Sequence, residues 1–301
     1  MCRKILVYFL WASSCLFMAD CQNNKSIIAE GATVEKLADG FSFTEGPAVD
    51  KAGNVYFTDQ PNDKIFKWSV DDKLTEYATG QGRANGMYFD NEGNLLSCSD
   101  LNNELWQINA DGSHVVLVSD FDGKKLNGPN DLWVHPKTGG IYFTDPLYPR
   151  EYWTSRGAEM QQDGQHVYYI SPDYMSVTRV ATDFKQPNGI IGTPDGKTLY
   201  VADIGDRKTY AYDIQNDGTL AGKRLLCEMG SDGMTIDSEG NIYLTGRGVT
   251  VFNPVGEQIL NIPVEAGWTA NACFGGSDMK WLYITASQGF YRIRMNVKGV
   301  K

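Results

Sequence analysis

Residues 45–59 read EGPAVDKAGNVYFTD, and residues 85–100 repeat the pattern as NGMYFDNEGNLLSCSD. In each copy a short apolar segment leads through a Gly-containing turn into a second strand-like run, which is typical of a β-hairpin. This second run occurs six times, as GNVYFTD (53–59), GNLLSCSD (93–100), GGIYFTD (139–145), GKTLYVAD (196–203), GNIYLTG (240–246) and KWLYITA (280–286). The chain is therefore built from six related units.

Each unit has room for about four antiparallel strands, because successive copies lie roughly forty to sixty residues apart. This spacing predicts an all-β fold, a six-bladed β-propeller, over residues 30–298 as a single domain. The segment ATVEKLADG (32–40) precedes the first copy and has no strand partner in its own unit. We expect it to form the outer strand of the last blade and close the ring, which removes an exposed sheet edge.

The N-terminal residues have a different composition. Two basic residues precede the apolar run ILVYFLWASSCLFMA (5–19), which has the length of a signal-peptide core and is too short for a membrane span. The pattern predicts a signal peptide over 1–20, a polar tether over 21–29 and a lipid anchor at Cys21, although Asp20 is unusual at such a cleavage site. We therefore expect a secreted protein that is periplasmic or lipid-anchored.

Charge and cysteine content exclude several classes of function. The formal net charge is −10, and no stretch concentrates Lys and Arg. Binding to nucleic-acid phosphates requires such clusters, so we expect no nucleic-acid partner. The cysteines after the leader are Cys98, Cys227 and Cys273, and their odd number and spacing favour buried thiols over disulfides or a metal site. No oligomer is predicted.

One polar residue recurs at the same offset in all six units. Nine residues before the turn residue that starts each second strand stand Glu45, Asn85, Asn130, Asn188, Asp232 and Asn271. In a propeller the first strand of every blade lines the central channel, so equivalent residues meet in one ring around the axis. Asn and Asp also precede Gly in ordinary turns. Six residues in register, one of them a Glu, favour the ring over six unrelated turns.

The composition of this ring predicts a metal site. Two carboxylates and four amides offer oxygen donors that suit Ca²⁺ or Mg²⁺, and also Mn²⁺, better than a structural zinc ion. Two carboxylates would also balance the charge of one divalent ion. We expect one divalent metal ion on the propeller axis, with Ca²⁺ as the first choice and Mg²⁺, Mn²⁺ or Zn²⁺ as alternatives.

The repeats also resemble a known family, the senescence marker protein/gluconolactonase/regucalcin-like six-bladed propellers, and especially its bacterial gluconolactonase branch. The matching motifs include FTEGPAVDKAGNVYFTD (43–59), LNGPND (126–131), QPNG (186–189), SDGM (231–234) and NACFGG (271–276). The resemblance implies one catalytic divalent ion held by Glu45, Asn188 and Asp232. Asn130 is a direct ligand in some members and a substrate contact in others, and both roles stay open here.

The function that the resemblance implies is metal-dependent hydrolysis of a sugar lactone. A metal ion at the channel mouth can polarise the lactone carbonyl and lower the pKa of a bound water. Asp232 is then the candidate general base or nucleophile, and Asn130 and Asn85 are candidate donors to the developing oxyanion. One alternative is hydrolysis of another activated ester, such as a phosphotriester, because the family includes enzymes related to diisopropylfluorophosphatase. Another is a non-enzymatic binding propeller with a structural ion.

Further residues are candidates for binding a lactone or sugar-acid substrate. The longest interval between ring residues contains the insertion LYPREYWTSRGAEMQQ (147–162), and long loops often cover a site. On this insertion Tyr152, Trp153 and Arg156 could also contact a sugar-like ring. Animal relatives have an Arg just before their ND motif; this chain lacks it, so Lys125 is a candidate basic contact. For His166 the alternative is a hydrogen-bonded residue at a strand edge. The predicted substrate contacts are Asn85, Asn271, Lys125, Tyr148, His166 and Trp268.

Overall fold

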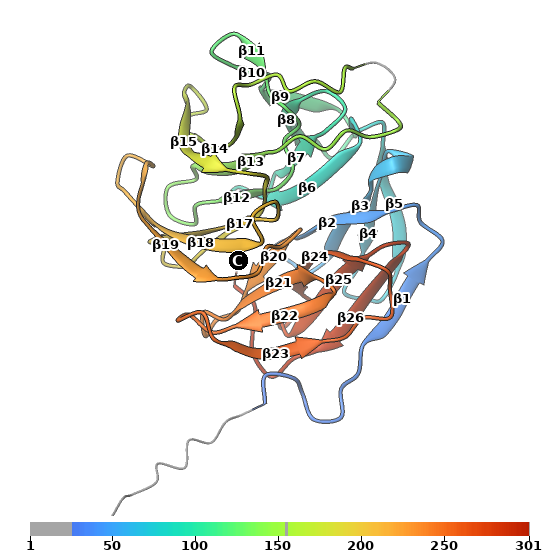
Figure 1. The fold of residues 1–301 in the computed structure, drawn as a ribbon. Coiled ribbons are helices and arrows are strands. Elements are labelled where there is room, and N and C mark those ends of the chain that lie inside the picture. Colours follow the sequence, from blue (N-terminus) through green and yellow to red (C-terminus); the bar gives the residue numbers. More distant parts are fainter. Residues whose placement is uncertain (1–25, 154–155, 301) are drawn as a thin grey trace, which may run out of the picture.

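The computed structural model describes residues 26–153 and 156–300 of the chain. In this part of the chain, six four-stranded antiparallel sheets stand around a common axis as the blades of a propeller, which confirms the predicted fold (Figure 1). The predicted signal peptide and Cys21 lie outside the described residues. Across the described ranges, no helix has the length and apolar character needed to cross a membrane.

The strands of each blade follow one another from the axis outward. Blade 1 contains β2 (Thr44–Val49), β3 (Val55–Asp59), β4 (Lys64–Trp68) and β5 (Leu74–Thr79). Blade 2 contains β6 (Ala84–Phe89), β7 (Leu95–Ser99), β8 (Glu104–Ile108) and β9 (His114–Val118). Blade 3 contains β12 (Leu132–Val134), β13 (Ile141–Asp145), β14 (Gln165–Ile170) and β15 (Val177–Phe184).

The second half of the ring has the same arrangement. Blade 4 contains β16 (Pro187–Gly192), β17 (Thr198–Asp203), β18 (Lys208–Ile214) and β19 (Leu220–Cys227). Blade 5 contains β20 (Met234–Ile236), β21 (Ile242–Gly246), β22 (Gly248–Phe252) and β23 (Gln258–Ile262). Blade 6 contains β24 (Thr269–Gly275), β25 (Trp281–Ala286), β26 (Gly289–Arg294) and β1 (Glu35–Asp39). Outside the blades are a 3₁₀ turn, η1 (Gln60–Asn62), and a hairpin of β10 (Asp120–Phe121) and β11 (Lys124–Lys125).

The N-terminal strand closes the ring as predicted. β1 pairs with β26 in antiparallel register, and in Figure 1 the blue β1 runs beside the red β26. Arg292 Nε lies 3.0 Å from Glu35 Oε2 across this pair. Ile28 forms a further antiparallel bridge with Met295, so packing against blade 6 begins before residue 30, the predicted start of the domain.

The repeated runs form the second strand of every blade and carry the core. β3, β13 and β21 are buried along their whole length, which explains why these runs are apolar rather than alternating. Their side chains pack between adjacent blades: Phe57 of β3 stacks on Phe290 of β26, with ring centroids 4.2 Å apart. Nearer the axis, Thr144 Oγ1 donates to the backbone oxygen of Asn188 at 2.8 Å. These contacts fix each blade against the next one.

The inner strands are irregular where the predicted polar residues stand. The strand register shifts between Glu45 and Ala48, between Ala84 and Met87, and between Pro187 and Ile190. A bulge of this kind bends a strand and changes the direction of a side chain. The irregularity therefore lies at the channel end where the site is built.

Candidate active site

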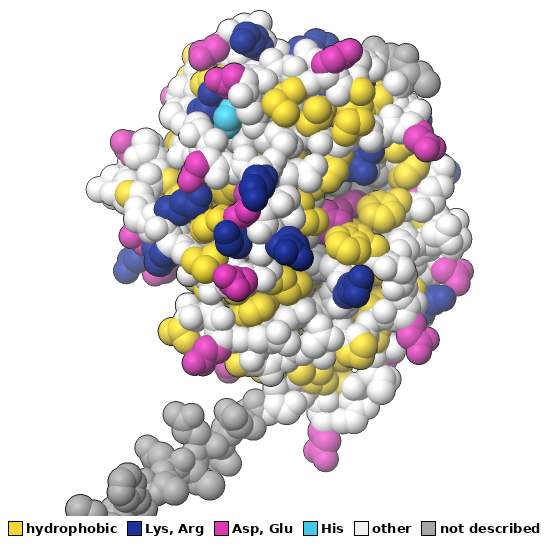
Figure 2. All heavy atoms as spheres, in the orientation of Figure 1, with side chains coloured by type: hydrophobic (Ala, Val, Ile, Leu, Met, Phe, Trp, Pro, Cys, Tyr) yellow, Lys and Arg dark blue, Asp and Glu magenta, His cyan; other side chains and the backbone are white. Residues whose placement is uncertain are grey.

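The six predicted ring residues lie at one end of the inner strands. Five of them, Glu45, Asn85, Asn130, Asn188 and Asn271, are buried, whereas Asp232 keeps a partly exposed surface. On the face seen in Figure 2, acidic side chains lie at the bottom of a hollow with hydrophobic side chains on its rim. Asp232 is therefore the ring residue that a ligand can reach most directly.

Asp232 is at the centre of a hydrogen-bond network that includes Asn188, Trp268 and, through Asn188, Tyr148 of the insertion. Asn188 Nδ2 donates to Asp232 Oδ1 at 2.7 Å, and Trp268 Nε1 donates to Asp232 Oδ2 at 2.6 Å. Asn188 Nδ2 also donates to Tyr148 Oη at 2.9 Å. Burial raises the pKa of the Asp232 carboxyl, and the hydrogen bonds from Trp268 and Asn188 oppose that shift. The structure thus brings together four residues that the sequence predicted separately.

Glu45 reaches the same group from blade 1. Its Oε2 accepts a hydrogen bond from Gly46 N at 2.7 Å. Burial raises the pKa of Glu45 well above its ordinary value, and the negative charges of Asp232 and Asp131 raise it further. Acids in one buried site repel each other unless a proton or a cation lies between them. The two predicted acidic ligands therefore lie close enough for their charges to interact.

Asp131 is an acidic residue that the sequence prediction missed. It stands where four other units have Gly after the ring residue, and its Oδ1 accepts from Leu132 N at 3.0 Å. Asn271 Nδ2 donates to Asp131 Oδ2 at 3.3 Å, and burial raises the pKa of Asp131 to about 8. Space for this carboxylate depends on Gly86, whose added Cβ would lie 2.6 Å from Asp131 Oδ1. The departure from Gly in the third repeat was the available signal.

Asn85 and Asn130 are held through their backbones. The Asn130 oxygen accepts from Gly86 N at 2.7 Å, and Asn130 N donates to Thr144 O at 2.9 Å. The Asn85 side-chain oxygen is buried and has no hydrogen-bond partner among the described residues. An unpaired buried amide oxygen carries a desolvation cost, so it is a position where a ligand or ion adds stability.

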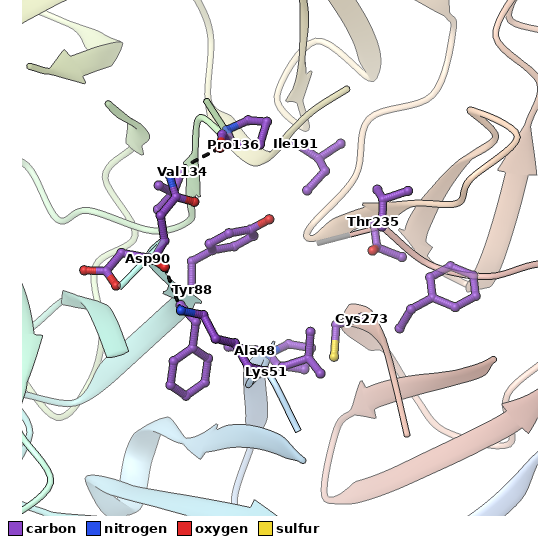
Figure 3. A pocket seen from close by; sticks show the side chains of 15 residues that line it. Ala48, Lys51, Tyr88, Asp90, Val134, Pro136, Ile191, Thr235 and Cys273 are labelled. Atoms are coloured by element: carbon purple, nitrogen blue, oxygen red, sulfur yellow. Dashed lines mark hydrogen bonds between the residues drawn. The ribbon is translucent and has the colours of Figure 1, made fainter. Parts of the chain in front are cut away.

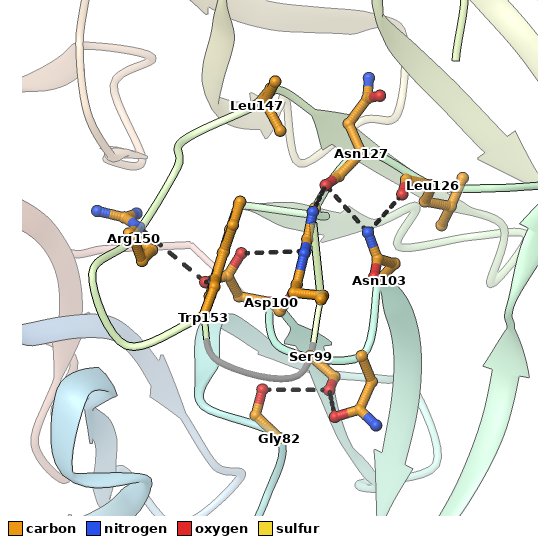
Figure 4. Close-up of polar contacts among 12 residues, drawn as sticks. Gly82, Ser99, Asp100, Asn103, Leu126, Asn127, Leu147, Arg150 and Trp153 are labelled. Carbon is orange, nitrogen blue, oxygen red and sulfur yellow. Dashed lines mark hydrogen bonds and ion pairs between the residues drawn. The ribbon is translucent and has the colours of Figure 1, made fainter. Parts of the chain in front are cut away.

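The insertion is tied down by Asp100 (Figure 4). Trp153 Nε1 donates to Asp100 Oδ2 at 3.0 Å, and Arg156 Nη1 donates to the Asp100 backbone oxygen at 2.6 Å. The Arg156 guanidinium stacks on Trp153 at 3.6 Å from the ring centroid. Trp153 and Arg156 are therefore engaged in anchoring, while Tyr148 extends to Asn188.

The structure does not bring Lys125 and His166 into the contacts around Asp232. Lys125 is exposed on the β10–β11 hairpin. His166 Nε2 lies 3.1 Å from Asp163 Oδ1, and Arg179 bonds the same carboxylate. His166 is therefore a hydrogen-bonded histidine, as the alternative expected, but it lies near the start of β14, which is paired on both sides, rather than at a strand edge.

The opposite mouth of the channel has a different character. A cavity of ≈ 230 Å³ lies there (Figure 3). Each inner strand contributes to its lining, with Ala48, Tyr88, Val134, Ile191, Thr235 and Cys273. Burial raises the pKa of the Tyr88 hydroxyl to about 12. The channel is thus acidic at one mouth and mostly apolar at the other.

Comparison with known proteins identifies the family. A family model described as the SMP-30/Gluconolactonase/LRE-like region matches residues 43–288. The chain belongs to this family. Within the SMP-30/gluconolactonase/LRE-like family, a gluconolactonase from Zymomonas mobilis subsp. mobilis is 27% identical over 304 residues, which cover 91% of this chain and 84% of that protein.

Two further relatives have been named for different activities. The solved structure of a gluconolactonase from Xanthomonas campestris matches with a TM-score of 0.81 at 27% identity, and covers 89% of this chain and 91% of that one. Diisopropyl-fluorophosphatase from Loligo vulgaris is 28% identical over 190 residues, which cover 58% of this chain and 59% of that protein.

SMP-30/gluconolactonase/LRE-like proteins are generally metal-dependent, so the donors in this chain can be tested for fit. Among residues 26–153 and 156–300, no group of three or more His, Cys, Asp or Glu side chains is arranged to hold a metal ion. A metal site in the ring would therefore include fewer than three such side chains, and amide oxygens would complete it. Hard divalent ions accept such mixed oxygen sets, and the unpaired Asn85 oxygen is one such donor. The donor chemistry fits a hard divalent ion.

Proposed function

We propose that this protein is a metal-dependent hydrolase that opens a sugar lactone. The observation that supports this most directly is that Asn188 bonds both Asp232 and Tyr148 while the charge of Asp232 acts on Glu45, in a chain that belongs to a family with gluconolactonases. The partly exposed surface of Asp232 gives a small substrate access to this group.

The proposed ligands for the metal ion are Glu45, Asn188 and Asp232, with Asn130 as a further candidate. When bound, a divalent ion supplies polarisation of the lactone carbonyl and lowers the pKa of a coordinated water. Ca²⁺ is the first choice, because carboxylate and amide oxygens without His or Cys are its preferred donors in proteins. Mg²⁺, Mn²⁺ and Zn²⁺ are the alternatives.

Asp232 is the proposed general base. The attacking water oxygen bonds to the carbonyl carbon, and a water proton passes to Asp232. The bond between that carbon and the ring oxygen breaks, and the proton passes from Asp232 to the ring oxygen. Trp268 and Asn188 each donate to one carboxylate oxygen, so they hold the Asp232 side chain in one orientation during this transfer.

Amide and hydroxyl donors would stabilise the charge that develops on the carbonyl oxygen. The Asn130 side chain makes no hydrogen bond with the described residues, so its N–H groups are available, and Asn85 lies in the adjacent blade. Tyr148 accepts from Asn188, and burial raises its pKa, so it keeps its own proton to donate to a substrate oxygen. One such donor is commonly worth about 3 kcal/mol in the transition state.

A second candidate function is hydrolysis of phosphotriesters. The similarity to the Loligo vulgaris diisopropyl-fluorophosphatase favours it. The same polarised centre would act on a phosphoryl oxygen in place of a carbonyl. A binding propeller with a structural ion is the non-enzymatic alternative.

Acid release from glucono-δ-lactone tests the proposal. The purified protein is stripped with a chelator and then supplied with Ca²⁺, Mg²⁺, Mn²⁺ or Zn²⁺, with diisopropyl fluorophosphate as the parallel substrate. We expect lactone hydrolysis to fall to the uncatalysed rate after chelation and to return with at least one ion. Background rates on both substrates with every ion would favour the binding propeller, and turnover of the fluorophosphate alone would favour the second candidate.

We also propose export and lipid attachment at Cys21. The support is the basic and apolar leader followed by a cysteine and polar residues. Metabolic labelling with a radioactive fatty acid tests this: the wild-type chain should incorporate the label and a Cys21→Ser chain should not.

A further inference from the structure

Arg150 lies on the insertion at the acidic mouth and has few interactions of its own. Its Nε is buried without a hydrogen-bond partner and lies 4.0 Å from Asp100 Oδ2. Figure 4 shows its terminal nitrogens pointing away from Asp100. The guanidinium lies over the Tyr148 ring, 5.1 Å from its centroid, and the side chain is 27% exposed. Arg150 is therefore held near the mouth with its donors free.

Two other arginines that contact the insertion or belong to it, Arg83 and Arg156, are already engaged. Arg156 bonds the backbone oxygens of Asp100 and Asn127. Arg83 bonds the backbone oxygen of Pro61, and its guanidinium lies 4.5 Å from the centroid of the Tyr152 ring. Of these three guanidinium groups, Arg150 alone makes no hydrogen bond with the described residues.

Arg150 is also close to the proposed reaction centre. The ring on which it lies belongs to Tyr148, whose hydroxyl is 2.9 Å from Asn188 Nδ2, and Asn188 contacts Asp232. A small molecule bound at Asp232 can therefore extend to Arg150.

We propose that Arg150 determines substrate specificity by binding an anionic group, a carboxylate or a phosphate, on a part of the substrate away from the lactone carbonyl. This inference rests on the proposed lactonase function and narrows its substrate class to acidic lactones. A guanidinium presents a fork of N–H donors that matches the paired oxygens of a carboxylate or phosphate. Arg150 belongs to the insertion and Asp232 to the ring, so an anionic group bound by Arg150 leaves the lactone ring to face Asp232.

The competing explanation is that Arg150 only supports the insertion by pairing with Asp100. The two explanations differ in their effect on different substrates. Loss of a structural pairing would weaken turnover of every lactone to the same degree. Loss of an anion-binding group would weaken only the acidic ones.

The experiment measures kcat and KM of the metal-loaded protein on three lactones: neutral glucono-δ-lactone, a monolactone of glucaric acid, which carries a carboxylate, and 6-phosphogluconolactone. The variants are Arg150→Gln, Arg150→Lys and Lys197→Gln. Lys197 is the control, because its side chain is 79% exposed at the turn between β16 and β17, away from Asn188, and its loss changes the net charge equally.

We expect the wild type to prefer at least one acidic lactone by about tenfold or more in kcat/KM, as charge-assisted hydrogen bonds allow. Arg150→Gln should remove this preference mainly through KM and change neutral-lactone turnover less than about threefold. Arg150→Lys should restore part of it, and Lys197→Gln should keep all of it. The lactone that shows the preference distinguishes carboxylate from phosphate. Equal losses on all three lactones, or no preference in the wild type, would overturn the inference.

Calorimetric titration with the ring-opened acids separates this inference from the proposed function. Gluconate, glucarate and 6-phosphogluconate are titrated into the same metal-loaded variants. If no lactone is hydrolysed, the proposed function fails, but tighter binding of glucarate or 6-phosphogluconate than gluconate, lost in Arg150→Gln, would still support the role of Arg150. Equal binding of the three acids by the wild type would overturn that role.

Discussion

Asp232 combines two features that a catalytic carboxylate needs. Both of its oxygens accept a hydrogen bond, from Asn188 and Trp268, which fixes the side chain. It also keeps a partly exposed surface while the other ring residues are buried. The proposed metal ligand and the proposed base are therefore the same residue, and a single substitution tests both roles.

Asp232→Asn should lower kcat on glucono-δ-lactone by about a hundredfold or more, because an amide cannot take a proton from water. The variant should remain folded, since Asn has nearly the same shape. Initial rates and the far-UV circular dichroism melting curve measure the two properties. Asp195→Asn, at an exposed turn, is the control. Wild-type turnover in Asp232→Asn would place the base on another residue.

Gly86 shows how closely the inner strands approach each other. A Cβ at this position would lie 2.5 Å from the Asn130 backbone oxygen. Gly86→Ala should lower the free energy of unfolding by about 3 kcal/mol, because backbone atoms at the axis must move. Denaturant unfolding measures the change. Gly267→Ala is the matched control, since the nearest atom there is a flexible Ser287 hydroxyl at 3.5 Å, and a similar loss in both variants would contradict the explanation.

At the scale of elements, the insertion between β13 and β14 is positioned by a residue of another blade. Asp100 follows β7 in blade 2 and contacts Trp153, Arg156 and Arg150 of the insertion. Burial raises the pKa of Asp100, and the nearby Arg150 charge opposes that shift. Contacts between blades 2 and 3 thus hold the insertion that carries Tyr148, which bonds Asn188, and Arg150, which lies over the Tyr148 ring.

Asp100→Asn should loosen the insertion and leave the propeller folded. The loss of a charged partner should cost about 2 kcal/mol, because hydrogen bonds to charged groups are stronger than neutral ones. Cleavage within residues 147–162 during limited proteolysis should become faster, and KM for lactones should rise. Unchanged cleavage rates would show that the insertion is held by other contacts.

The closing strand β1 is the second element whose role can be tested. A chain that begins at Gly40 lacks β1 and exposes the edge of β26. Its melting temperature should fall by about 10 °C, the shift expected for a loss of roughly 4 kcal/mol in a chain of this size. A chain that begins at Ser26 keeps the strand and is the control. Equal melting temperatures for the two chains would mean that β1 contributes little to the closure.

At the scale of the whole molecule, the proposed ligands come from separated parts of the ring. Glu45 belongs to blade 1, Asn188 to blade 4, and Asp232 precedes the first strand of blade 5. An ion held by all three therefore links blade 1 to blades 4 and 5. A metal ion that binds the folded protein but not the unfolded chain would stabilise the complete ring.

Removal of the metal ion should lower the melting temperature of the protein. An ion present at about one hundred times its dissociation constant adds about 2.7 kcal/mol to the free energy of unfolding. Differential scanning fluorimetry with a chelator, and then with excess Ca²⁺, should show a reversible decrease of several degrees. The Asp232→Asn protein should show a smaller response. An identical melting temperature with and without chelator would contradict an ion bound on the axis.

Local patterns were sufficient to predict the propeller. Strand runs such as GNVYFTD carry their own turn and strand preferences, so six copies predict six blades wherever they stand in the chain. The offset of Glu45, Asn188 and Asp232 within the repeats predicted that they would meet, because equivalent positions of repeated blades share one distance from the axis. In a repeat protein, a pattern within one repeat therefore predicts which residues of distant repeats lie close together.

Other features depended on contacts that no local pattern contains. Asp131 replaces the Gly that four other repeats have at this position. Its burial at the axis follows from the space left by Gly86 in the neighbouring blade. The insertion has no repeat, and its course depends on contacts with residues such as Asp100, which is 50 residues before Arg150 in the chain, and Asn127. His166 and Lys125 have chemistry suited to a site, but the structure places His166 near the start of β14 and Lys125 on a hairpin. Side-chain type can be read along a chain, whereas proximity between non-repeated segments arises only when the blades pack.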